Sequence, residues 1–94
     1  MYKYFIELLG VVVLTYATLL TDGNPLVMGI AYFSVYMISQ EAEKVYFNPF
    51  FVIANLVLGR TTFGDVWGHI LAQALGVLFT LVTFVPTKTF IDAV

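Results

Sequence analysis

The sequence predicts an all-α membrane protein with three transmembrane helices and a re-entrant loop that carries a half-spanning helix. Hydrophobic residues make up 61% of the 94 residues and charged residues 11%, with a mean hydropathy of +0.94, whereas ordinary soluble domains contain about a quarter charged residues. The apolar residues form three long runs and one short run. This length accommodates about three or four spans and no soluble domain beside them, so residues 1–94 are expected to form a single transmembrane module.

The first apolar run predicts a helix over about residues 4–21, because it closes on the turn-forming cluster TDGNP. Lys3 precedes the run, as a basic residue does in a signal peptide. However, no small-residue cleavage site comes before the turn, and the run is long for the apolar part of a signal peptide. A retained helix is therefore expected.

The second and third runs predict two further spans. The second begins at Pro25, a good first-turn residue, and continues over about residues 25–41, where charged residues such as Glu41 mark the return to water. The third, over about residues 66–85, is long enough for a full span and stops before Pro86.

The short run, YFNPFFVIANLVLG, lies between these spans and is too short to cross a membrane. Asn48 is a preferred N-cap and Pro49 suits the first helical position, so a helix of about ten residues, or half the hydrocarbon core, should begin there. A helix lying flat at the interface is the simpler alternative. However, the unpaired N–H groups at this apolar start cannot face lipid. We therefore expect a re-entrant loop and half-helix over about residues 42–59.

Four motifs, taken in order, are similar to those of the first half of an aquaporin or aquaglyceroporin channel, the major intrinsic protein family. In that family a first-helix Glu is followed by Gly, Asn-Pro-Ala begins the half-helix, Gly-Arg ends it, and Ala-Gln-x-x-Gly lies in the third helix. The matching residues here are Glu7 and Gly10, Asn48 and Pro49, Gly59 and Arg60, and Ala72, Gln73 and Gly76. The resemblance covers nearly the whole chain, but only one of the family's two halves.

The resemblance implies a role for each polar member of the set. Asn48 would turn its amide toward a pore, where the half-helix dipole repels cations, and it can cap the helix at the same time. Glu7 would accept hydrogen bonds from the backbone of the re-entrant loop, and Gln73 would brace the same loop from the third helix. The alternative for Glu7 is a side chain that snorkels to the nearby membrane surface.

The resemblance and the spacing from Asn48 also imply a pore lining that is mostly apolar with phenolic tips. Its members are Leu14, Met28, Tyr32 and Tyr46, and Asn48 and Pro49 join them at the point where two half-helices would meet. Phe50 replaces the usual Ala of the motif, and Phe51 stands where the family's second half has a selectivity Arg. These aromatic residues either line a wider pore or plug it.

Small residues are expected to let helices approach closely. They are Gly10, Gly68, Ala72 and Gly76. Trp67 and His69, at the start of the third span, are interpreted as aromatic-belt residues at the membrane boundary. No second His, Cys or acidic residue joins His69 at ligand spacing, so no metal site and no cofactor is predicted.

Three crossings and a loop that returns to its own side put the two termini on opposite faces of the bilayer. A complete pore then needs two inverted units. We therefore expect a passive channel for water, with glycerol or other small neutral solutes as further candidates, built as an antiparallel homodimer and assembled into a tetramer of pores as in the family. Lys3, Lys44 and Arg60 fall on one face and Lys88 on the other. This bias favours one orientation in the membrane. Since an antiparallel homodimer needs both orientations, a separately encoded second half is the rival to the homodimer.

Two other functions remain as alternatives. The first is a dual-topology, proton-coupled exporter that uses Glu7, although such proteins lack a re-entrant half-helix. The second is a non-conducting assembly partner of a full-length channel. No nucleophile with a base, phosphate loop or paired intramembrane carboxylates indicates an enzyme, and a net charge of −2 provides no basic arm for nucleic acid.

Overall fold

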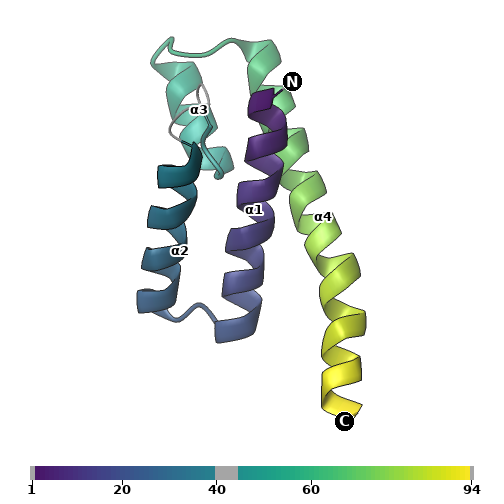
Figure 1. Ribbon diagram of the computed structural model, residues 1–94. Helices are drawn as coiled ribbons and strands as arrows, with labels where there is room; N and C mark the ends of the chain where they lie inside the picture. Colours follow the sequence, from purple (N-terminus) through teal and green to yellow (C-terminus); the bar gives the residue numbers. More distant parts are fainter. Residues whose placement is uncertain (1, 40–44, 94) are drawn as a thin grey trace.

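The computed structural model describes residues 2–39 and 45–93, and this part of the chain contains four helices and no strand (Figure 1). The helices are α1 (Tyr2–Thr21), α2 (Pro25–Ile38), α3 (Pro49–Val57) and α4 (Phe63–Ala93). The predicted all-α fold is therefore confirmed for the described residues. By length and composition, α1 and α4 are apolar enough to cross a membrane.

The helix bounds differ from the prediction mainly at α4. It begins at Phe63 and continues through Pro86 to Ala93 instead of stopping at residue 85. A proline costs a helix one backbone hydrogen bond, and in α4 this loss does not end the helix. Helix α2 ends at Ile38, capped by Ser39, whose N–H donates to a carbonyl one turn earlier. Residues 40–44, which include the predicted end of the second span and the start of the re-entrant loop, lie outside the described residues.

Helices α1 and α4 run side by side in the same direction. The Tyr4 hydroxyl donates to Asp65 Oδ1 at 2.6 Å near the start of both helices, and the Tyr16 hydroxyl bonds Thr83 more than three turns further along. Lys3 also pairs with Asp65, at 3.0 Å. Helix α2 returns antiparallel to α1 after a tight turn (Figure 1).

Three of the predicted small residues lie where α4 faces α1. A Cβ on Gly76 would lie 2.9 Å from the carbonyl oxygen of Leu8, and a Cβ on Gly68 would lie 2.6 Å from the ring of Tyr4. Ala72, between them, is buried. These residues therefore let the two helices approach closely, because larger side chains would meet backbone or aromatic atoms.

Helix α3 begins beside the N-terminal half of α1 and runs back toward the end where the N-terminus lies (Figure 1). The residues ahead of it contact α1 at Glu7 and Gly10. Pro49, its first residue, shares a hollow with Leu14 in the middle of α1. Helix α4 then starts at the level of Lys3. At nine residues, α3 is about 14 Å long. The two chain ends lie at opposite ends of the molecule.

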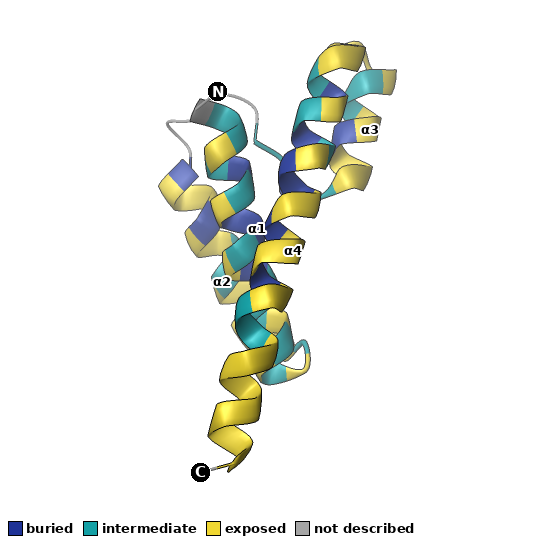
Figure 2. Ribbon diagram, turned by 90° about the vertical axis from the view of Figure 1, so that its right-hand side faces the viewer, coloured by how far each residue is buried: buried dark blue, intermediate teal, exposed yellow. Residues whose placement is uncertain are grey.

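Most large apolar side chains are exposed, and the last part of α4 is exposed on every side (Figure 2). In each of the two long helices, only 22% of the most apolar 18-residue stretch is buried. Scattered apolar residues are common on soluble proteins, but a continuous apolar surface marks contact with a membrane or a partner. Packing in the core of the chain therefore does not explain why its helices are so apolar, because most of their apolar side chains are not buried there.

Candidate functional site

The start of α3 is built by two adjacent residues. Asn48 has extended backbone angles, and its side-chain oxygen accepts a hydrogen bond from Phe50 N at 2.8 Å. Pro49 occupies the first helical position, where its missing N–H costs no hydrogen bond. Because the cap uses the Asn48 oxygen, the amide nitrogen is the group that this side chain can offer to a solute.

A buried carboxylate holds the segment that leads into this helix. Glu7 has no exposed surface, and each of its oxygens accepts two hydrogen bonds. Oε1 accepts from Phe47 N and Gln73 Nε2, both at 2.6 Å. Oε2 accepts from Tyr46 N at 2.9 Å and bonds His69 Nδ1 at 3.1 Å. We call this group the Glu7 clamp: Glu7, His69, Gln73 and the backbone N–H groups of Tyr46 and Phe47.

The clamp decides between the two interpretations of Glu7. A snorkelling carboxylate would reach solvent, whereas this one is enclosed and has four hydrogen-bonding partners. Two of these are backbone N–H groups ahead of α3, the contact that the family resemblance implies. Within the described residues, the Gln73 side chain makes its hydrogen bond to Glu7 and is connected to the loop through that carboxylate. Burial of an ionised carboxylate is tolerated when it is fully hydrogen-bonded.

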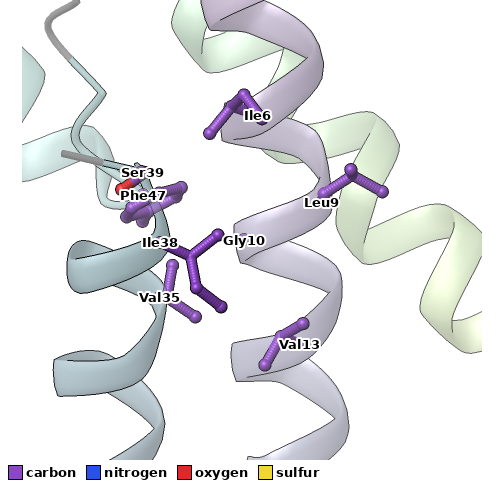
Figure 3. Close-up of a pocket in the computed structure, with 8 residues that line it drawn as sticks. All are labelled: Ile6, Leu9, Gly10, Val13, Val35, Ile38, Ser39 and Phe47. Atoms are coloured by element: carbon purple, nitrogen blue, oxygen red, sulfur yellow. The ribbon is translucent and has the colours of Figure 1, made fainter. Parts of the chain in front are cut away.

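Phe47 adopts an unusual backbone conformation. Its φ is +60°, in the left-handed region that few non-glycine residues occupy. Its ring lies against Gly10 in the gap between α1 and α2, beside a small cavity of about 100 Å³ (Figure 3). A Cβ at residue 10 would overlap this ring. The predicted role of Gly10 in helix packing is therefore corrected, because Gly10 makes room for the Phe47 ring, ahead of α3, rather than for a neighbouring helix.

Helix α2 supplies a further tie to the same segment. The Tyr36 hydroxyl donates to the carbonyl oxygen of Tyr46 at 2.8 Å, and the Tyr36 ring packs edge-to-face on Phe47 with centroids 5.1 Å apart. With the Glu7 clamp, these contacts connect the segment ahead of α3 to α1, α2 and α4.

His69 is not the boundary residue that its position in the sequence suggests. It has no exposed surface, and besides bonding Glu7 it contacts the rings of Tyr4 and Tyr46 at 5.1 and 4.9 Å between centroids. The belt interpretation is wrong for His69, although Trp67, 59% exposed, is compatible with it. The available signal was helical spacing: His69 lies four residues before Gln73, so both side chains project from one face.

An open hollow of about 320 Å³ lies beside the start of α3. Four predicted pore residues line it, Leu14, Met28, Tyr32 and Pro49, together with Gln73. The remaining lining residues are Val11, Thr15, Thr18, Phe47 and Val77. Helices α1, α2 and α4 and the start of α3 with the residue ahead of it thus all contribute to one hollow, which is mainly apolar with a few hydroxyl and amide groups.

Four other predicted pore residues do not line this hollow. Tyr46 packs on His69. Asn48 is partly buried, and its neighbours in the sequence, Phe47 and Pro49, line the hollow. Phe50 and Phe51 are 77% and 50% exposed on α3. In a single chain these two phenylalanines therefore neither plug the hollow nor contribute to its wall.

The described residues contain no group of three or more His, Asp or Glu side chains placed to hold a metal ion. Comparison of the chain with models of protein families, with curated proteins and with solved structures finds no match. The functional argument therefore depends on the residues and geometry of this chain.

Proposed function

We propose that this chain is half of a passive transmembrane channel for water, with glycerol and other small neutral solutes as further candidates, and that two inverted copies complete the pore. The observation that carries the proposal is the start of α3. This helix begins within the length of α1, not at its end, beside a hollow to which α1, α2 and α4 contribute, and the Glu7 clamp holds the residues ahead of it.

The chemistry of the hollow favours a neutral polar solute. The N-terminus of a helix carries about half a positive charge, so the start of α3 repels cations. Asn48 does not line the hollow of the single chain, but its side-chain N–H groups lie at this helix start and can donate to a solute that reaches it. The hydroxyls of Thr15 and Thr18 bond carbonyl oxygens of their own helix and retain lone pairs that can accept from a passing solute.

The open side of the hollow supports a second copy. Hydroxyl, amide and helix-start groups are costly against lipid hydrocarbon, so another protein surface is needed to cover them. An inverted copy would supply a second α3, pointing with its N-terminus at the first, as in transporters built from inverted repeats. The partner is then a second copy of the chain, and the two copies form an antiparallel homodimer within the lipid bilayer. Four such pores form the larger assembly, a tetramer. A separately encoded second half is the alternative partner.

The buried state of Glu7 argues against the exporter. A carboxylate that loads and releases protons and substrate needs an accessible face, and Glu7 is enclosed by four hydrogen-bonding partners. If the protein gives no water flux, we propose instead that it is a non-conducting assembly partner of a full-length channel.

The test is the rate at which proteoliposomes shrink under an osmotic step. We expect vesicles that contain the wild-type protein to shrink faster than empty vesicles. Vesicles with Met28→Trp should shrink no faster than empty ones, because an indole at residue 28 fills the hollow. Leu26→Trp is the matched control, since Leu26 lies on the same helix, is 72% exposed and does not line the hollow. If folded, dimeric wild-type protein gives no gain over empty vesicles, the channel proposal fails.

A further inference from the structure

His69 is the one histidine of the chain, and the proposed channel does not itself require it. Its imidazole makes two kinds of contact. Nδ1 bonds Glu7 Oε2 at 3.1 Å, and the ring meets Tyr46 with centroids 4.9 Å apart and planes at 76°. His69 therefore touches both the carboxylate that holds the re-entrant segment and a side chain of that segment.

The backbone of Tyr46 is held at both of its polar groups. Its N–H donates to Glu7 Oε2, and its carbonyl accepts from the Tyr36 hydroxyl. Only rotation about the side-chain bonds remains free, and staggered rotamers allow few positions for the ring. In the position observed, the ring packs on His69, while the next residue, Phe47, lines the hollow.

The hydrogen bond to Glu7 orients the imidazole. An ionised carboxylate can only accept, so Nδ1 carries the proton in this contact. The second nitrogen, Nε2, is buried and has no hydrogen-bond partner among the described residues. The imidazole is therefore held by Glu7 on one side and by the rings of Tyr4 and Tyr46 around it.

We propose that His69 is a positioning residue that keeps the Tyr46 ring out of the hollow: Glu7 fixes the imidazole, and the imidazole fixes the ring. Without the imidazole, the Tyr46 ring rotates toward the hollow and narrows it. The effect on flux rests on the proposed channel, whereas the effect on the ring does not, so the two are measured separately.

Two substitutions separate the contacts of His69. His69→Asn keeps an N–H donor one bond from Cγ, where Nδ1 stands, and removes the ring. His69→Phe keeps a ring and removes the donor. Nuclear Overhauser contacts of the Tyr46 ring and hydrogen exchange of the Tyr46 and Phe47 amides are recorded in nanodiscs. In His69→Asn we expect new contacts between the Tyr46 ring and Leu14 or Met28, with slow amide exchange retained. In His69→Phe we expect the ring to stay and the amides to exchange faster.

The rate of osmotic shrinkage then shows whether the position of the Tyr46 ring affects water flux through the proposed channel. The gain in rate should fall toward that of empty vesicles in His69→Asn and return in His69→Asn combined with Tyr46→Ala. Trp67→Phe, two residues away and exposed, should match the wild type. Wild-type protein with no flux but the predicted ring contacts would refute the channel and leave the positioning role intact.

Three results would overturn the positioning role. One is a wild-type spectrum without the Tyr46–His69 ring contact, or with the Nδ1 nitrogen unprotonated, which needs no variant. Another is the same change in ring contacts and amide exchange in both substitutions, as general loosening of the core would produce. The last is an unmoved Tyr46 ring in folded His69→Asn.

Discussion

Replacing Glu7 by Gln is the most direct test of how the segment ahead of α3 is held. The carboxylate has four hydrogen-bonding partners, two on each oxygen. An amide has one acceptor oxygen, so two partners lose their bond, and its own N–H groups then point at donors. Each buried donor left without a partner costs about 1–3 kcal/mol. The segment ahead of α3 should therefore open more easily by about 2–6 kcal/mol.

Hydrogen exchange of single amides measures this opening. Because about 1.4 kcal/mol corresponds to a factor of ten, the amides of Tyr46 and Phe47 should exchange at least about thirtyfold faster in Glu7→Gln than in the wild type. Amides in the middle of α4 should change less, since local opening does not need the whole fold to unfold. Asp92→Asn serves as the control, because its pair with Lys88 is exposed. If the Tyr46 and Phe47 amides keep their wild-type rates in folded Glu7→Gln, the Glu7 clamp does not hold the segment.

Other substitutions test the packing around this site. Gly10→Ala puts a methyl group into the ring of Phe47 and should lower the free energy of unfolding by about 1–3 kcal/mol, visible as a lower thermal midpoint in detergent; an unchanged midpoint would contradict the close contact. Gly76→Val should separate α1 from α4, since even a Cβ would meet the Leu8 carbonyl, and spin labels on the two helices should report a longer distance. Asn24→Ala removes the acceptor for two N–H groups at the start of α2 and should cost about 1 kcal/mol, measured by chemical unfolding; a loss no larger than that of Asn24→Ser would argue against the cap.

Local signals in the sequence predict the helices well. The Asn-Pro pair marks the start of α3, and the TDGNP cluster marks the turn after α1. The end of α3 is equally local. Gly59 has a φ of +73°, and the next N–H, of Arg60, donates to the carbonyl of Asn55 at 2.8 Å, which is the bonding of a glycine-terminated helix. Such signals depend on a few neighbouring residues, so a single sequence carries them.

Contacts between distant residues were harder to predict. Nothing near Gly10 in the sequence indicates that it faces the ring of Phe47, and the left-handed backbone of Phe47 runs against its own preference. His69 reads as a boundary aromatic until the fold brings it to Glu7, 62 residues earlier. The length of α4 was underestimated because Pro86 is a helix breaker in local statistics, and α4 nevertheless continues to Ala93.

The Glu7 clamp also sets an order of events during synthesis. The carboxylate belongs to the first helix made, whereas its side-chain partners, His69 and Gln73, are 62 and 66 residues further along the chain. Until α4 emerges and docks beside α1, Glu7 therefore lacks two of its four hydrogen-bonding partners. A ribosome-bound intermediate that ends before residue 69 should accordingly leave Glu7 open to chemical modification, and the completed chain should protect it.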